Sequence, residues 1–326
     1  MMKKDVAIRT LVVVMMTTIL VAAFLNRTFL RDLIVGATFS ESAEISSIKT
    51  NLELTGGADV VFRATKPKLL KEDQFNNTCR DDDAYISILG CYVNDEISLY
   101  DIKSSELNGI VESTAAHELL HAVWKRMDDG EKNRIGELLN AVYNDELYNK
   151  ELKNELSNYS SDELLDELHS RVGTEIKNLP KELEEHYAKY FRNQDVVVKF
   201  YEKYNEIFKE IKKERDELES EMQNINTIIG QKAILYKEKN NSLSSKVLEF
   251  NQCAETPGCF TSTGEFYAKR SELLAEQAEL NEDYEEINVL IDDYNSLIKK
   301  YNANVLKEKN FDNIINSNVK NDDLIK

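Results

Sequence analysis

Residues 114–123 read Thr114-Ala-Ala-His-Glu-Leu-Leu-His-Ala-Val123 and contain the pattern His-Glu-x-x-His. Its histidines, His117 and His121, are four residues apart, so on a helix they lie about 40° apart around the axis and both can reach one metal ion. Glu118 projects close enough to contact a water molecule on that ion. The intervening and flanking residues are uncharged, as a buried helix requires. The stretch predicts a metal-binding helix that carries its own general base.

The motif also has a simpler interpretation, in which two core histidines pack together beside an exposed Glu118. The positions of the histidines argue for the metal, because all four in the chain, at 117, 121, 169 and 186, fall in one part of the sequence.

The His-Glu-x-x-His pattern resembles that of the zincin metallopeptidases. The resemblance implies zinc, a helix that carries two of its ligands, and peptide hydrolysis with Glu118 as the general base. It extends over about residues 58 to 191. The same run resembles that of uncharacterised bacterial membrane-anchored proteins. The metzincin subgroup does not fit, because Met127 stands at its third-histidine position and Trp124 at its glycine position.

Catalytic zinc takes three protein ligands and a water molecule, so a third ligand is needed. The segment from Asp166 to Glu175 resembles the second zinc helix of the gluzincins, and this resemblance assigns Glu167 as that ligand. The gap from His121 is longer than in that family, and Arg171 stands where the family has an acidic residue that orients a metal-bound histidine. Glu175 is expected to supply that carboxylate or to be the ligand itself, and His169 is a further candidate for the ligand.

Peptide hydrolysis also needs a hydrogen-bond donor to the oxyanion of the tetrahedral intermediate. The gluzincin resemblance assigns this role to His186 and Tyr187, although an amphipathic helix with inward-packed aromatic residues explains the same stretch. The segment 97–102 is expected to be either the edge strand that pairs with an extended substrate or an internal strand.

The segment Thr10 to Leu25 is apolar and follows Lys3, Lys4 and Arg9. It predicts an uncleaved signal-anchor over residues 1–34, with a cleaved signal peptide as the alternative. In both cases the remaining chain lies outside the cytoplasm. Two local disulfides, Cys79 with Cys91 and Cys253 with Cys259, are expected in that oxidising compartment.

An α+β fold is expected for the zincin-like catalytic domain at 58–194, after a polar connector at 35–57. Strands are predicted at 58–64, 85–89 and 96–102, and helices at 113–126, 131–143, 161–176 and 182–191. Unbroken heptads then predict an antiparallel α-helical coiled-coil hairpin at 195–309, followed by a flexible tail at 310–326.

The composition fits this organisation. The chain has 326 residues with three Pro and eleven Gly, which favours long helices with little sheet. It carries 59 acidic and 41 basic residues, a net charge of -18, which argues against a nucleic-acid partner.

Together these patterns predict a membrane-anchored extracytoplasmic zinc metallopeptidase whose substrate is a protein or peptide, with a protein partner for the hairpin. The alternative is a membrane-tethered coiled-coil scaffold with a non-catalytic zinc-binding domain.

Overall fold

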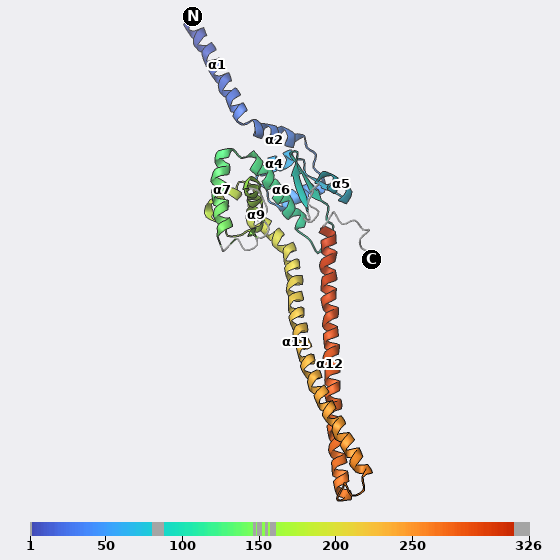
Figure 1. Ribbon diagram of the computed structural model, residues 1–326. Helices are drawn as coiled ribbons and strands as arrows, with labels where there is room; N and C mark the ends of the chain where they lie inside the picture. Colours follow the sequence, from blue (N-terminus) through green and yellow to red (C-terminus); the bar gives the residue numbers. More distant parts are fainter. Residues whose placement is uncertain are drawn as a thin grey trace. The chain divides into compact units, whose positions relative to one another are not determined.

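The computed structural model (Figure 1) describes residues 2–79, 88–145, 148, 152–153, 156 and 161–315. The chain divides into two compact units. The first comprises Met1–Ile207 with Phe311–Lys326, and the second comprises Phe208–Asn310. The first is mostly helical with a small mixed sheet, which confirms the predicted α+β class.

The sheet has three strands in the order β1-β3-β2. β1 (Lys68–Leu70) runs parallel to β3 (Glu96–Tyr100), and β2 (Gly90–Val93) runs antiparallel to it. Asn94 and Asp95 connect β2 to β3 with φ of 53° and 66°, as a two-residue hairpin turn requires. The segment predicted at 96–102 is therefore the internal strand, and among the described strands β1 and β2 form the two edges beside it.

Residues 56–64 form a helix, α4 (Gly56–Ala64), and not the strand that the sequence predicts for 58–64. The side chain of Thr55 caps the helix by accepting a hydrogen bond from the backbone N–H of Ala58 at 3.3 Å. Ala58 and Phe62, four residues apart, are both buried on the same helix face. The cap and this period outweigh the strand preference of the valines at 60 and 61.

The connector expected at 35–57 is also largely helical. It contains the end of α2 (Arg27–Thr38), all of α3 (Ala43–Asn51) and the start of α4. Ser42 caps α3, and Ile45 and Ile48 from α3 are buried in the core. This segment therefore packs as part of the first unit.

α1 (Met2–Leu25) precedes α2. Among the described residues, no single helix is both long enough and apolar enough to cross a membrane. Leu11–Phe24 and Arg27–Thr38, bent by 71° relative to each other, meet the length and composition criteria when taken together. The signal-anchor expected at 1–34 stays a prediction.

Four further helices of the first unit contribute to one hydrophobic core: α6 (Ile110–Arg126), α7 (Asp129–Asn144), α9 (Ser161–Glu175) and α10 (Lys181–Tyr187). The short helix α5 (Glu72–Thr78) precedes β2 in the chain. The helices predicted at 113–126, 131–143 and 161–176 agree with this order, while α10 ends at Tyr187, earlier than expected. Most of the strand predicted at 85–89 lies outside the described residues.

The second unit consists of the greater part of α11 (Gln194–Glu255) and α12 (Thr263–Ile315), which run side by side (Figure 1). Lys246 pairs with Glu276 at 2.5 Å and Lys232 with Glu286 at 2.5 Å. Because the partner's number rises as the lysine's number falls, the helices are antiparallel. The predicted hairpin is therefore confirmed.

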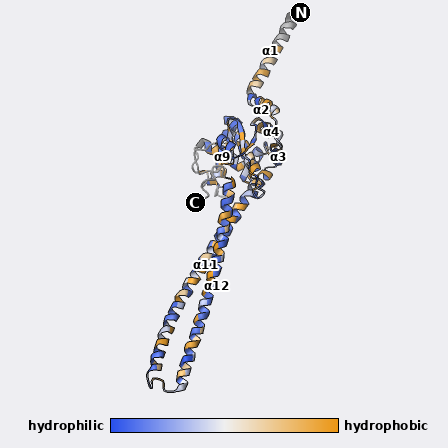
Figure 2. Ribbon diagram, turned by 90° about the vertical axis from the view of Figure 1, so that its right-hand side faces the viewer, coloured by the Kyte–Doolittle hydropathy of each residue, from blue (hydrophilic) through white to orange (hydrophobic). Residues whose placement is uncertain are grey.

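The hairpin is held together by a heptad seam, seen as hydrophobic positions at intervals along both helices in Figure 2. Leu243, Leu273 and Leu280 are buried together, with Tyr236 and Phe250 packed against them, and all five are seam positions. α12 continues through the first residues of the predicted tail to Ile315, and the rest of that tail lies outside the described residues.

Both predicted disulfides are present. Cys79 bonds to Cys91 at the end of α5 and in β2, and Cys253 bonds to Cys259 at the tip of the hairpin. Bonded cysteines are typical of an extracytoplasmic compartment.

Candidate metal centre

The His-Glu-x-x-His motif lies in the second half of α6, which is buried on most of its surface. Gly109 precedes the helix with φ of 103°, a conformation that favours glycine, and Lys125 and Arg126 complement the helix dipole in the last turn. His117 and His121 occupy the least buried face, and their Nε2 atoms lie 3.0 Å apart. The spacing of four residues brings the two rings together as predicted.

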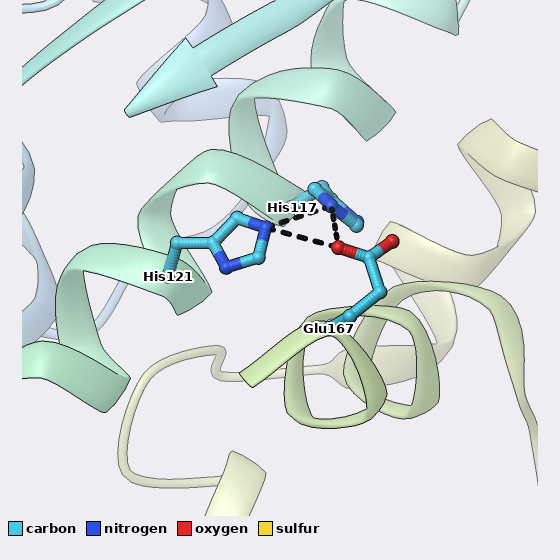
Figure 3. Close-up of side chains that lie close together, drawn as sticks. All are labelled: His117, His121 and Glu167. Carbon is cyan, nitrogen blue, oxygen red and sulfur yellow. Dashed lines mark hydrogen bonds and ion pairs between the residues drawn. The ribbon is translucent and has the colours of Figure 1, made fainter. Parts of the chain in front are cut away.

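Glu167 reaches the same point from α9. Its Oε2 atom lies 3.7 Å from His117 Nε2 and 3.5 Å from His121 Nε2, and Figure 3 shows the three side chains converging from the two helices. Each side chain offers one ligand atom, and these atoms all lie within 4.8 Å of one another. The structure thus brings together the three predicted ligands in a group that could hold a metal ion.

The donor set also fits zinc in its spacing. Zinc bound tetrahedrally at about 2.0–2.1 Å separates neighbouring ligand atoms by about 3.3 Å. The three separations in this site, 3.0, 3.5 and 3.7 Å, bracket that value. Two imidazoles and one carboxylate also leave a fourth position open, as in catalytic zinc sites.

Close contact between α6 and α9 depends on Gly173. A Cβ atom at this position would lie 2.5 Å from Leu120 Cδ1 of α6 and 2.5 Å from Tyr187 Cε1 of α10. Real Cβ atoms do not approach so closely, so only glycine permits this separation between the helices. Gly173 thereby sets the distance at which Glu167 meets the two histidines.

The other two candidates for the third ligand do not belong to this group, although Glu175 lines the same cavity as the three ligands. His169 is fully buried, and its Nε2 atom lies 2.9 Å from His186 Nε2. Glu175 lies 3.8 Å from the guanidinium of Arg171.

Asp166 supplies the orienting carboxylate that the sequence analysis sought in Glu175. Its Oδ1 atom lies 2.7 Å from His121 Nδ1, which directs the Nε2 atom of that ring toward Glu167. Sequence reasoning missed this residue because the family places the carboxylate at the position of Arg171. The signal in the sequence is that Asp166 directly precedes the ligand Glu167, because a carboxylate close to a metal ligand can orient a metal-bound histidine. Arg171 instead donates from Nε to Glu167 Oε1 at 2.8 Å.

Glu118 lies beside this group in a cavity of about 450 Å³, whose walls come from β2, α6 and α9. The residue is only 6% exposed. Gly90 of β2 lies directly against it, because a Cβ there would be 3.0 Å from Glu118 Oε1. Burial raises the pKa of Glu118, and the nearby imidazoles offset this only in part. Such a carboxylate is well suited to accept a proton.

The charged side chains of the site pair with one another. Burial opposes protonation of His121, but hydrogen bonds to Asp166 and Glu167 outweigh it and raise the pKa of His121 to about 10. Burial likewise opposes ionisation of Glu167, but hydrogen bonds from His117, His121 and Arg171 hold its pKa far below its usual range.

His186 and Tyr187 lie in the core beneath α6 and α9. They are 1% and 0% exposed, and the Tyr187 hydroxyl donates to the backbone carbonyl of His169 at 2.8 Å. Burial lowers the pKa of His186 to about 4, so it is neutral at neutral pH and can share an N–H···N hydrogen bond with His169. Neither residue lines the cavity around Glu118. The oxyanion role expected for them stays a prediction, without a contact in its support.

Comparison of the chain with protein-family models, with curated proteins and with solved structures finds no match. The geometry of the site is therefore the basis on which a function is inferred.

Proposed function

We propose that this protein is a zinc-dependent peptidase that works outside the cytoplasm and is attached to a membrane through α1. The observation that carries the proposal is the convergence of His117, His121 and Glu167 within 4.8 Å, in a cavity that also contains the buried carboxylate of Glu118.

The donor atoms favour zinc over other common ions. Calcium and magnesium prefer six or more oxygen ligands, whereas zinc accepts imidazole nitrogen with a carboxylate in a site of low coordination number. When bound, zinc supplies a Lewis acid that polarises a carbonyl and lowers the pKa of a water molecule.

The chain's own groups then handle the proton. Glu118, whose pKa is raised by burial, accepts a proton from the attacking water at its carboxylate and returns it to the leaving amine. Asp166 keeps His121 oriented through Nδ1, and Arg171 holds one oxygen of Glu167 so that the other faces the histidines. Each group that touches the ligands thus preserves the geometry in which Glu118 acts.

A peptide fits the cavity because β2 forms one of its walls. An edge strand offers free backbone N–H and C=O groups, with which an extended peptide can pair. Gly90 places the start of this strand against Glu118, so a paired peptide would pass close to the base. We therefore assign to β2 the substrate-pairing role that the sequence analysis considered for 97–102.

The location is supported by two features. The disulfides favour an oxidising compartment outside the cytoplasm. The described side chains of α1 include a run of exposed apolar residues from Leu11 to Phe24, which an aqueous environment would not stabilise. Attachment to a bilayer through α1, with the rest of the chain outside the cytoplasm, accounts for both the exposed apolar residues and the disulfides.

The test uses the full-length protein in detergent, its Glu118→Gln variant, and Glu137→Gln as a matched control on the exposed surface of α7. We expect about one zinc ion per chain in all three proteins, loss of zinc on chelation, and cleavage of unfolded casein by the wild type and the control. Glu118→Gln should lower the cleavage rate by about 10²- to 10⁴-fold, because it removes the general base but no ligand.

Equal zinc content with no cleavage by any of the three proteins, extended to a broad peptide library, would contradict the proposal. It would indicate instead a tethered scaffold with a non-catalytic zinc-binding domain.

A further inference from the structure

α2 has its polar and apolar faces reversed relative to an ordinary surface helix. Its buried residues are Asp32, which is 2% exposed, and Gly36. Its large hydrophobic side chains are turned outward, with exposed fractions of 53% for Phe29, 39% for Leu30, 45% for Leu33 and 66% for Ile34. On a helix these four residues form one continuous apolar face.

The inner face of α2 is fixed by an ion pair. Asp32 accepts hydrogen bonds from Arg126 Nε at 2.7 Å and Nη2 at 3.2 Å, and Arg126 also donates to Asp95 at 2.9 Å. Arg126 is the last residue of α6. Turning α2 over to bury its apolar face would separate the buried carboxylate of Asp32 from the guanidinium of Arg126, which is unfavourable.

Gly36 holds α2 against α4. A Cβ at this position would lie 3.2 Å from the backbone oxygen of Val60 and 3.3 Å from Arg63 Cβ, closer than most Cβ contacts. The orientation of α2 is therefore set by backbone packing as well as by charge, and its apolar face is left directed away from the unit.

We propose that α2 lies in the headgroup region of the membrane, with Phe29, Leu30, Leu33 and Ile34 among the acyl chains. The inference rests on the membrane attachment included in the proposed function. The membrane is the expected partner of this apolar face because α2 begins two residues after α1 ends and is bent by 71° from it. A helix at that angle to a membrane span lies along the surface (Figure 2 shows the hydrophobic residues of both).

Charge complementarity supports the same occupant. Arg27 lies exposed at the start of α2, where a guanidinium group can reach lipid phosphates, whereas Arg31 pairs with Asp95 at 2.7 Å and with Asp32 at 3.0 Å. His121 precedes Arg126 by five residues, about 7.5 Å along α6. The docked helix would therefore hold the metal centre close to the membrane surface.

The test measures the depth of single positions in the bilayer. All four native cysteines are paired in disulfides, so one added cysteine is the only free thiol. The variants are Ile34→Cys in α2, Leu20→Cys in α1 and Asn140→Cys, an exposed control in α7. Each full-length protein carries a nitroxide label and is reconstituted into vesicles of equimolar phosphatidylcholine and phosphatidylglycerol. Retained zinc content shows that each variant is folded.

We expect collisions with oxygen to exceed those with a water-soluble nickel chelate several-fold at positions 20 and 34, and the reverse at position 140. A label at 34 in water, with the label at 20 in the bilayer, would overturn the inference and leave the anchor intact. Both labels in water would overturn the inference and the anchor together. Spin–spin broadening at position 34 between copies, without oxygen contact, would also overturn it, because a second copy would then cover the face.

Discussion

Asp166 is a single carboxylate whose replacement tests the orientation of the metal ligands. Asp166→Asn keeps the size of the side chain but removes the charge that stabilises the Nδ1–H of His121, 2.7 Å away. We expect zinc affinity to fall by about 10- to 100-fold, as measured by competition with a chromogenic chelator. Glu137→Gln on the exposed face of α7 should leave the affinity unchanged. Equal affinities in both variants would show that Asp166 does not orient the ring.

His121 makes zinc binding dependent on pH. Its pKa in the metal-free protein is raised to about 10, so it is protonated at neutral pH and must lose that proton to coordinate. Zinc affinity should therefore rise with pH, by about tenfold per pH unit for one proton released, between about pH 6 and 8. Calorimetry in buffers of different ionisation enthalpy counts the protons. An affinity that stays flat over this range would contradict the pairing of His121 with Asp166 and Glu167.

At the scale of single residues, the sequence predicted the groups whose geometry is local. His117, Glu118 and His121 share one helix, and a spacing of four residues fixes their relation before any tertiary contact forms. Glu167 required a family resemblance, because nothing local relates α9 to α6. Asp166 was missed because the direction in which it leaves α9 depends on how that helix packs.

Among the secondary structure elements, α9 depends on a glycine for its position. A Cβ in Gly173→Ala would come within 2.5 Å of Leu120 and Tyr187, so α9 must shift away from α6. We expect a loss of about 1–3 kcal/mol in the free energy of unfolding, measured with urea, together with weaker zinc binding as Glu167 moves. Gly57→Ala in α4 is the matched control, because a Cβ there has nothing within 4 Å. A Gly173→Ala protein as stable as this control would refute the tight contact.

Elements whose sequence carries one strong period were predicted correctly, whereas some short elements, such as α3 and α4, were not. The heptads of α11 and α12 repeat over many turns and leave no competing interpretation. In α4 the valines at 60 and 61 favour a strand, and the outcome was decided by the Thr55 cap and by burial of Phe62 against the core. Such short segments take the structure that their tertiary contacts stabilise.

The division of the whole molecule into two units predicts how zinc affects stability. All three ligands belong to the first unit, and residues 208–310 contain none of them. Zinc at about a thousandfold excess over its dissociation constant should stabilise the first unit by about 4 kcal/mol and leave the melting of the hairpin unchanged. Scanning calorimetry with and without zinc should show one transition that moves and one that does not. A single transition that shifts as a whole would contradict this independence.

The bond between Cys79 and Cys91 ties β2, one wall of the cavity beside Glu118, to the end of α5. None of the three metal ligands depends on that bond for its own position, since they come from α6 and α9. In the reducing cytosol the chain would therefore be able to bind its metal ion before the disulfide forms. At that stage β2, the strand proposed to pair with the substrate, would not yet be tied to α5. Under the proposed function, formation of this disulfide after export would complete the strand that pairs with the substrate, and would so confine hydrolysis to the outside of the cell.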